Sequence, residues 1–438
     1  MRLGFRPFII GVLVLGLIGV STAGRTFAEQ DDAVTKHPPA HVEPNTAPAR
    51  PAPPPDVSAK AAALIDVDSG RILYEKNAHE KLPIASLTKI MTAIVAIEAA
   101  DLDEVVTVSP RAVGIEGSSI YLRQGERMTL RDLLYGLMLR SGNDAALAVA
   151  EHVGGSVESF VAMMNEKAAW LGLMETHWTN PHGLDDPDHY SSAYDLVRLS
   201  AYALHNPTFR RIVSTQKWTA PLPGAAWDRL WLNKNRLLSL YPYADGIKTG
   251  YTKQTGRALA ASATRDGRRL AAVVLNDGDD WNDSIRLLDY GFDVFQPVEF
   301  ASPDQPIIAW RDDRPVRLYP CRRFIYPLRS EEIDRIESAV VWQDQKSGGA
   351  PAFVVFMLDG RPIARLPLYE RPPEEMRPSS AAMDRPSGRC MPSSADGDHA
   401  AGQSVAQPDD ARYAHAQNVF RLFWSLLLAP TEKGAATE

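Results

Sequence analysis

The chain has 438 residues, of which 45% are hydrophobic, and a formal net charge of -7. The length suffices for two ordinary domains with packed cores, and the negative charge argues against a general role in binding nucleic acid. The two cysteines, Cys321 and Cys390, lie in no metal-binding or redox motif. We expect no structural disulfide, because Cys390 falls in a stretch without the pattern of a folded element.

The N-terminus has the pattern of a secretory signal peptide. Two arginines precede an apolar run over residues 8–20, and the small residues that follow allow cleavage after Ala23 or Ala28. The run is shorter than the roughly 20 residues that span a bilayer as a helix. An uncleaved anchor is the alternative, and under both interpretations the rest of the chain works outside the cytoplasm. Residues 29–57 form a proline-rich spacer, which favours an extended conformation over a packed core.

Two strand–turn–strand patterns enclose a mostly helical region. AAALIDV and RILYEKN flank a turn at residues 68–70, and RALAASAT and RLAAVVLN flank a turn at residues 265–267. Between residues 86 and 204, apolar side chains recur at a spacing of three to four, which predicts helices. Another helix is predicted at DSIRLLDYGFDVF. Strands, then helices, then strands indicate one α+β domain with an antiparallel sheet.

From about residue 297 the pattern changes to short strand-like runs: PIIAW, VRLYP, AVVWQ, AFVVFML and RPIARLPLY. Asp359 and Gly360 predict a tight turn between the last two runs. Residues 297–370 are therefore predicted to form a small all-β domain. Residues 371–412 are rich in Pro, Ser, Ala and Asp without periodicity, which is typical of a disordered linker.

The last apolar segment, YAHAQNVFRLFWSLLL at residues 413–428, predicts an amphipathic helix. One face would carry the residues Val419, Phe420, Phe423, Trp424 and Leu427. The segment is too short to span a bilayer, but it suits a helix that lies in the membrane interface. The alternative is a helix docked on the β domain, which the long linker disfavours.

The most informative motif is Ser86–Lys89 in PIASLTKIMTAIVAIEAA, at the start of an apolar helix. Positions three apart share one side of a helix, so the lysine amine can reach the serine hydroxyl. Serine is a poor nucleophile until a base takes its proton, and an amine is that base only when neutral. Burial against the core disfavours the ammonium form, and a helix N-terminus offers N–H groups to a developing oxyanion. The alternative is that Ser86 caps the helix and Lys89 reaches solvent.

A Ser-x-x-Lys motif alone is weak evidence, and the chain contains a second copy, Ser214–Lys217. That lysine precedes a strand-like WTA without an apolar helix to bury it, so we interpret this copy as a coincidence. Two further motifs support the first copy, SGN at residues 141–143 and KTG at residues 248–250. Each alone more often caps a helix or ends a strand, but the three in this order are a specific signal.

In this ordered set the chain resembles the penicillin-recognising serine enzymes. It is most similar to the serine-type D-alanyl-D-alanine carboxypeptidases among the low-molecular-mass penicillin-binding proteins. The stretches that carry the resemblance are ASLTKIMTA, LMLRSGNDAA, ETHWTNPHGL, HYSSAYDL, DGIKTGYT and LLDYGF. It covers residues 58–296 closely and residues 297–370 more loosely.

The resemblance implies an α+β fold of the β-lactamase and penicillin-binding-protein type, in which helices flank an antiparallel sheet, followed by a small all-β domain. The implied activity is removal of the terminal D-alanine from peptidoglycan stem pentapeptides through a penicillin-sensitive acyl-enzyme. Such an enzyme would act in cell-wall synthesis and cell shape. Its partners would be peptidoglycan stem peptides and, as inhibitors, β-lactam antibiotics.

The resemblance also implies roles for named residues. The catalytic group would be Ser86 as nucleophile, Lys89 as general base, Ser141 as proton relay and Asn143 as a contact to the substrate amide and Lys89. The substrate-binding group would be Lys248 and Thr249 for the terminal carboxylate, then Gly250 and Tyr251, with the backbone N–H groups of Ser86 and Tyr251 as oxyanion hole. A terminal carboxylate needs a cation and a hydroxyl donor, and a second lysine near Lys89 would help to keep its amine neutral.

Two positions depart from the family pattern. Some members have a histidine where Tyr251 stands, although only its backbone is required. Some carry an arginine downstream of the KTG motif, where this chain has Asp280, so carboxylate binding is expected to depend on Lys248 and Thr249. The histidines of THWTNPHGL have no metal-ligand spacing, and we predict no metal and no cofactor.

Three other functions compete with the carboxypeptidase. A D,D-endopeptidase would use the same motifs on cross-links, but the β domain and the family stretches favour the carboxypeptidase. A β-lactamase needs a glutamate that positions water, and residues 144–247 contain no such motif. A catalytically idle wall-binding protein would not need the intact serine and lysine residues.

The predicted organisation is a signal peptide (1–28), a proline-rich linker (29–57), a D,D-carboxypeptidase catalytic domain (58–296), a small β-rich domain (297–370), a disordered linker (371–412) and a membrane-anchoring amphipathic helix (413–428). The expected location is the periplasm, with the last helix holding the enzyme on the outer face of the inner membrane.

Overall fold

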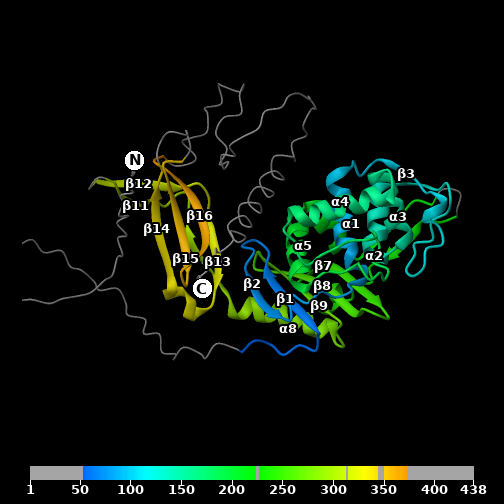
Figure 1. Cartoon of the computed structure of the whole chain (residues 1–438), viewed down its shortest axis with the longest axis horizontal. Helices are drawn as coiled ribbons and strands as arrows, with labels where there is room; N and C mark the ends of the chain where they lie inside the picture. Colours follow the sequence, from blue (N-terminus) through cyan, green and yellow to red (C-terminus); the bar gives the residue numbers. More distant parts are fainter. Residues whose placement is uncertain (1–52, 223–225, 312–313, 344–349, 372–438) are drawn as a thin grey trace, which may run out of the picture. The chain divides into compact units, whose positions relative to one another are not determined.

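The computed structural model describes residues 53–222, 226–311, 314–343 and 350–371 (Figure 1). The predicted signal peptide, most of the proline-rich linker, nearly all of the C-terminal linker and the predicted amphipathic helix lie outside the described residues. Within the described ranges, no helix is long and apolar enough to cross a bilayer. The domain boundaries stay a prediction.

A five-stranded antiparallel sheet organises the larger part of the described chain. Its strand order is β2-β1-β9-β8-β7, formed by β1 (Ala61–Asp66), β2 (Ile72–Lys76), β7 (Ala244–Thr252), β8 (Gly256–Arg265) and β9 (Arg268–Leu275). Both predicted hairpins, β1–β2 and β8–β9, are confirmed. The pairing of β1 with β9 brings the two ends of this region together, and β7, which carries the KTG motif, forms one edge of the sheet.

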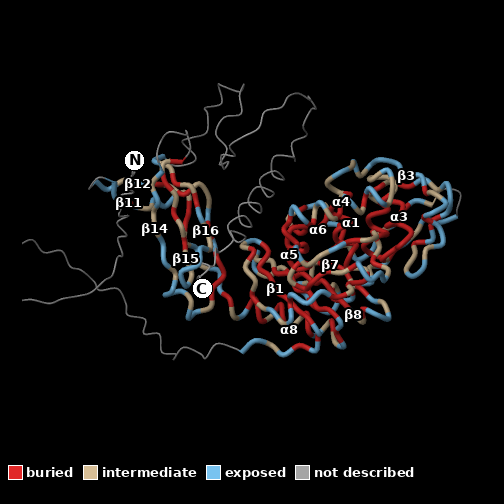
Figure 2. The backbone as a smooth tube through the Cα atoms, viewed as in Figure 1, coloured by how far each residue is buried: buried red, intermediate tan, exposed pale blue. Residues whose placement is uncertain are grey.

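Both faces of this sheet are covered, and every residue of β1 is buried (Figure 2). Ala61, Ala63 and Ile65 belong to a large apolar cluster that includes the helices on one face. Ala62 and Leu64 belong to a second cluster, which includes α8 (Asp280–Val294) on the other face. This alternation is the two-residue period of a strand, and it explains why β1 is apolar from Ala61 to Ile65.

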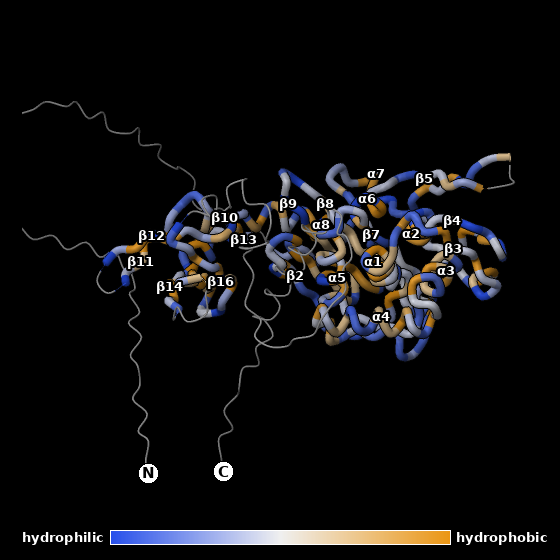
Figure 3. Tube along the Cα trace, turned by 90° about the horizontal axis from the view of Figure 1, so that it is seen from above, coloured by the Kyte–Doolittle hydropathy of each residue, from blue (hydrophilic) through white to orange (hydrophobic). Residues whose placement is uncertain are grey.

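The helices follow the predicted apolar spacing, and hydrophobic residues are orange in Figure 3. They are α1 (Lys89–Ala99), α2 (Leu130–Arg140), α3 (Asn143–Gly154), α4 (Val157–Trp170), α5 (Ala193–His205), α6 (Pro207–Ser214) and α7 (Leu237–Leu240). Side-chain caps begin several of them: the Thr129 hydroxyl accepts from the N–H of Asp132 at the start of α2, and Ser192 does the same for α5. These caps fix where each helix starts.

Two short hairpins were not predicted, although the sequence analysis read WTA at residues 218–220 as strand-like. They are β3 (Val105–Thr107) with β4 (Arg127–Thr129), and β5 (Lys217–Ala220) with β6 (Arg229–Leu232). Strands of three or four residues are too short to show a two-residue alternation above chance.

The strands after α8 form a separate apolar cluster with its own sheet. The sheet has the order β11-β12-β16-β15-β14, and β10 pairs with β13. The bounds are β10 (Gln296–Ala301), β11 (Ile307–Arg311), β12 (Arg314–Pro320), β13 (Phe324–Leu328), β14 (Ile336–Trp342), β15 (Ala352–Leu358) and β16 (Arg361–Tyr369). The predicted turn between the last two strands is confirmed: Asp359 and Gly360 both have positive φ, 52° and 72°, as a tight hairpin turn requires.

The predicted fold class is confirmed. Helices flank an antiparallel sheet in the first part of the described chain, and a small β-rich part follows. The sequence analysis named neither β10 nor β13, the two strands that pair with each other.

Candidate active site

Ser86 lies in a single 3-10 turn, Ala85–Thr88, that leads directly into α1. The sequence analysis expected the α-helix to begin at the serine, but regular α-helical structure begins at Lys89. The turn starts with strained backbone, because Ala85 has φ of 47°, a conformation that residues other than glycine rarely adopt. The half-buried Ser86 is therefore presented on a sharp bend rather than on a regular helix.

The Lys89 amine is fully buried and lies among three oxygen atoms. Its Nζ is 3.0 Å from Ser86 Oγ, 2.7 Å from Asn143 Oδ1 and 2.6 Å from the carbonyl oxygen of His182. The Asn143 amide is oriented by its own Nδ2, which donates to the carbonyl of Glu116 at 2.6 Å. Asn143 must therefore present an acceptor, not a donor, to the lysine.

The surroundings hold the Lys89 amine toward its neutral form. Burial, more than any other cause, lowers the pKa of Lys89 well below the usual lysine value, and the cations of Lys248 and Lys234 lower it further. The carboxylate of Asp144 acts in the opposite direction. Burial and the Lys234 cation also lower the pKa of Lys248, to about 7. Both effects follow from the cost of an ammonium ion in an apolar site beside another cation.

The SGN motif forms the junction between α2 and α3. Ser141 ends α2 in a left-handed conformation with φ of 64°, and Asn143 is the first residue of α3. Both are buried. The left-handed residue at the end of α2 lets the chain reverse before α3 begins. Asn143, at the start of α3, is thereby placed within hydrogen-bond distance of the Lys89 amine.

The KTG motif lies on the edge strand β7, beside the 3-10 turn that contains Ser86. Lys248 is 2% exposed, and its Nζ donates to the carbonyl of Thr249 at 2.9 Å. A Cβ atom at Gly250 would lie 3.2 Å from the carbonyl oxygen of Ile84 and 3.4 Å from the backbone nitrogen of Ser86. The strand passes so close to the serine that a side chain larger than hydrogen would crowd it. Tyr251, the next residue, turns its side chain to solvent and is 67% exposed.

The structure thus gathers the Ser86, Lys89 and Asn143 side chains directly, and it places Lys248 near enough to act on the pKa of Lys89. The catalytic and binding roles of the eight predicted residues stay predictions.

Sequence reasoning missed two contributors to this site. The first is Lys234, whose Nζ donates to Ser118 Oγ at 2.9 Å and whose charge lowers the pKa of both site lysines. The second is the backbone of His182, an acceptor for Lys89. Lys234 stands in WLNKNRLL, which matches no motif, and a carbonyl acceptor leaves no signal in the sequence. Neither residue could be found before the chain was folded.

Two other features singled out in the sequence analysis, Asp280 and the second Ser-x-x-Lys copy, have other contacts in the structure, as has Trp281, the neighbour of Asp280. Asp280 is buried and bonds with Arg257 at the start of β8. Trp281 packs against the apolar cluster under α8. Ser214 and Lys217 of the second Ser-x-x-Lys copy belong to α6 and β5, and Lys217 is exposed. Among the residues that the structure describes, no three histidine, cysteine or acidic side chains gather closely enough to hold a metal ion.

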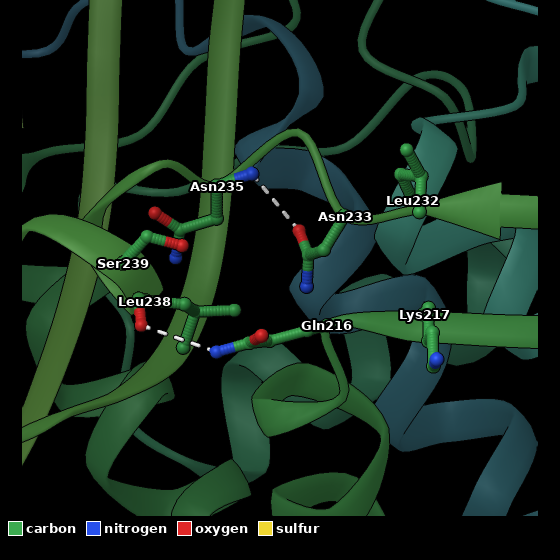
Figure 4. Close-up of a pocket in the computed structure, with 7 residues that line it drawn as sticks. All are labelled: Gln216, Lys217, Leu232, Asn233, Asn235, Leu238 and Ser239. Carbon is green, nitrogen blue, oxygen red and sulfur yellow. Dashed lines mark hydrogen bonds between the residues drawn. The ribbon is translucent and has the colours of Figure 1, made fainter.

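A cavity of about 480 Å³ borders that second copy (Figure 4). It is lined by Gln216, Lys217, Leu232, Asn233, Asn235, Leu238 and Ser239. Internal bonds occupy part of its wall, since Gln216 Nε2 donates to the carbonyl of Leu238 and the N–H of Asn235 donates to Asn233 Oδ1. None of the eight predicted site residues lines this cavity.

An α+β fold in which a buried lysine amine of lowered pKa contacts a serine hydroxyl and an asparagine amide is typical of a serine enzyme of acyl transfer. Comparison with known proteins agrees with this class. The family described as D-alanyl-D-alanine carboxypeptidase matches residues 47–279. D-alanyl-D-alanine carboxypeptidase DacF of Bacillus subtilis is 36% identical over 308 residues, which cover 68% of this chain and 74% of the relative. DacC of Escherichia coli is 38% identical over 274 residues, which cover 59% and 67%.

Solved structures show the same likeness. The chain superimposes on penicillin binding protein 5 from Haemophilus influenzae with a TM-score of 0.62 and 30% identity, covering 73% of this chain and 98% of that one. For penicillin binding protein 6B from Escherichia coli the TM-score is 0.59 and the identity 31%, with 72% and 96% covered. The chain belongs to the D-alanyl-D-alanine carboxypeptidase family of serine-type peptidases.

Proposed function

We propose that this protein is a serine D,D-carboxypeptidase that removes the terminal D-alanine from peptidoglycan stem pentapeptides through an acyl-enzyme on Ser86. The observation that carries the proposal is the position of the Lys89 amine, buried and 3.0 Å from Ser86 Oγ. Its relatives are named for this activity or for penicillin binding. β-Lactams, which mimic the D-alanyl-D-alanine end, are the expected inhibitors.

The contacts of Lys89 explain how it would act as a base. A neutral amine has two N–H bonds and one lone pair, and the two carbonyl-type oxygens of Asn143 and His182 can accept the two N–H bonds. The lone pair is then left for the Ser86 hydroxyl. As the amine takes the hydroxyl proton, Ser86 Oγ forms a bond to the substrate carbonyl carbon. The C–N bond then breaks, and the leaving D-alanine amine receives the proton through Ser141. Water hydrolyses the resulting ester by the same proton path in reverse.

The terminal carboxylate would bind Lys248 and Thr249. With a pKa of about 7, Lys248 is only partly charged at neutral pH in the free protein. A bound carboxylate favours the ammonium form of Lys248. Substrate binding would therefore protonate Lys248 fully, and the resulting positive charge would hold the substrate carboxylate.

The oxyanion of the tetrahedral intermediate would be bound by the backbone N–H groups of Ser86 and Tyr251. The close approach of Gly250 to the Ser86 nitrogen supports this arrangement. It brings the backbone of β7 beside the serine, where two N–H groups can converge on one oxygen. The exposed Tyr251 side chain has no part in this step.

The test is incubation of the purified protein with a stem pentapeptide and, separately, with a cross-linked muropeptide. The expected result is release of free D-alanine from the pentapeptide. Cleavage of the cross-link without release of D-alanine would replace the proposal by the D,D-endopeptidase alternative.

We further propose that the chain is exported and held at the outer face of the inner membrane by residues 413–428. The amphipathic pattern of that segment and the signal-like N-terminus support this location. Deletion of everything after Arg412 should move the protein from the membrane fraction to the soluble fraction. If the truncated protein still sediments with membranes, the N-terminal segment is the anchor.

A further inference from the structure

A loop over residues 179–189 packs directly against the 3-10 turn Ala85–Thr88, which contains Ser86. Its carbonyl groups accept from two side chains of α1: His182 from Lys89 at 2.6 Å and Pro181 from Thr92 at 2.6 Å. At Gly183 the loop leaves no room for a side chain, because an added Cβ atom would lie 1.9 Å from the carbonyl oxygen of Ala85. The loop therefore touches both the base and the peptide group that precedes the nucleophile.

His189 ends this loop, and its hydrogen bonds define its protonation. The ring is 4% exposed. Nδ1 accepts from the backbone N–H of Thr179 at 3.1 Å, which leaves the ring proton on Nε2, 2.7 Å from the Thr88 hydroxyl. Burial lowers the pKa of His189 to about 4, so the neutral form with this single donor is present at neutral pH.

The Thr88 hydroxyl continues the chain of hydrogen bonds. It accepts from His189 Nε2 and donates its own proton to the carbonyl of Ala85 at 2.8 Å. The order is therefore Thr179 N–H to His189, His189 to Thr88, and Thr88 to Ala85. Each member is buried or part-buried, where such a chain has a defined direction.

The last acceptor in this chain belongs to the same peptide group as the Ser86 N–H. A peptide unit is planar, and in the trans form its C=O and N–H point in opposite directions. A restraint on the direction of the Ala85 carbonyl is therefore also a restraint on the direction of the Ser86 N–H. The restraint is needed because Ala85 has a positive φ, which costs free energy unless the surroundings hold it.

We propose that His189 is a positioning residue for the oxyanion hole: through Thr88 it fixes the Ala85–Ser86 peptide plane so that the Ser86 N–H points at the developing oxyanion. The hydrogen bonds of the His189 ring go to Thr88 and Thr179, not to Ser86. The inference rests on the proposed function, since it requires that Ser86 be the nucleophile.

Two substitutions separate the two hydrogen bonds of the ring. His189→Gln can place an amide NH₂ where Nε2 stands and so keep the donor to Thr88. His189→Asn can place an oxygen where Nδ1 stands and keep only the bond from Thr179. His177→Gln is the matched control, because it removes an exposed imidazole of the neighbouring bridge that bonds to the carbonyl of Asp188 instead.

The readouts are kcat and KM for D-alanine release, and the infrared band of the ester carbonyl in the penicilloyl-enzyme, identified by a carbon-13 label. Removal of one oxyanion-hole donor costs about 10²–10³ in kcat in serine peptidases. Misdirection rather than removal should cost less, roughly 10–100-fold for His189→Asn, with KM within about twofold. Its carbonyl band should move to higher frequency because the oxyanion-hole hydrogen bond weakens. His189→Gln and His177→Gln should keep the wild-type band and kcat within a few-fold.

A purely structural role for His189 predicts a different pattern. Both His189 variants would then lose similar activity in proportion to their loss of thermal stability, and the carbonyl band would not move. That result, or wild-type kcat in His189→Asn, would overturn the proposal. D-alanine release and an adduct on Ser86 in the wild-type protein test the proposed function separately, whatever the variants do.

Discussion

The chain carries the same four-residue pattern at two places, and only one of them has the surroundings of a catalytic site. At residues 86–89 the serine lies in a 3-10 turn, and the lysine amine, 0% exposed, contacts three oxygens. At residues 214–217 the serine ends α6 and donates to the carbonyl of Arg211, and the lysine begins β5 in solvent. Both copies have the same spacing between serine and lysine. Only the lysine of the first copy is buried and has its amine within hydrogen-bond distance of three oxygens.

From this contrast we infer that the surroundings of the lysine, and not its spacing from the serine, decide whether it can act as a general base. An exposed lysine keeps its proton at neutral pH. Desolvation and two neighbouring cations favour the neutral amine of Lys89. Substitutions made in pairs, one at each copy, therefore separate the effect of the motif from the effect of its surroundings.

The largest effect is expected from the serines. Ser86→Ala should abolish covalent labelling by penicillin and D-alanine release, because it removes the hydroxyl that lies 3.0 Å from the buried Lys89 amine. Ser214→Ala should leave both unchanged. Mass spectrometry of the penicillin adduct is the measurement. An adduct on Ser214, or undiminished labelling in Ser86→Ala, would show that the nucleophile has been misassigned.

The paired lysine substitutions come next. Lys89→Arg keeps a positive charge, but arginine cannot be deprotonated in a protein, so the acylation rate should fall by about 10²–10⁴-fold. Lys217→Arg should have no effect on that rate. Lys248→Arg should be milder than Lys89→Arg, since its proposed task needs only a cation. Equal, small losses at residues 89 and 248 would contradict proton transfer by Lys89. Stopped-flow acylation with a chromogenic β-lactam measures all three.

The pH profile of kcat/KM should have an acid limb that reports the titration of Lys89 and an alkaline limb that reports the titration of Lys248. The proton must be absent from Lys89, so the acylation rate should fall as the pH drops through its lowered pKa. The proton must be present on Lys248, whose pKa is about 7, so substrate binding should weaken as the pH rises through that value. In each limb the rate changes up to about tenfold per pH unit, as for a single proton.

Lys248→Arg sharpens this assignment. Arginine keeps its charge throughout, so the alkaline limb of kcat/KM should disappear in this variant, whereas Lys217→Arg should retain the whole profile. Persistence of the alkaline limb in Lys248→Arg would assign that limb to another group.

The sequence was informative where local chemistry decides the structure. The hairpin turns at residues 68–70 and 265–267, the apolar helix after Ser86 and the three ordered motifs were all visible as patterns, and the resemblance to a known family named their roles. Contacts made by backbone atoms across long distances in the chain were not visible. The carbonyl of His182 and the approach of Gly183 to Ala85 depend on how the loop at 179–189 folds onto α1. Lys234 is a cation of the site only because β6 and α7 place it beside Ser118.

The smallest effect expected is on stability, and it again contrasts a buried lysine with an exposed one. Lys248 is buried and its pKa is lowered from 10.5 to about 7. Between these two values the unfolded chain binds a proton that the folded chain releases, so the free energy of unfolding of the wild-type protein rises with pH across this window. Below pH 7 the folded protein bears the full cost of the buried ammonium ion. Methionine has a similar shape without that cost.

Lys248→Met should therefore be more stable than the wild-type protein at pH 6, by on the order of 1–4 kcal/mol, or a few degrees in Tm. The advantage should shrink as the pH rises from 7 toward 10.5, while activity is lost at every pH. Lys217→Met, at the exposed copy, should change Tm little at any pH. Thermal unfolding of the three proteins at pH 6, 8 and 10 is the measurement. A lower Tm for Lys248→Met than for the wild-type protein at pH 6 would contradict this prediction. It would mean that the Lys248 ammonium ion is well solvated or paired in the folded protein, so that its burial costs no stability.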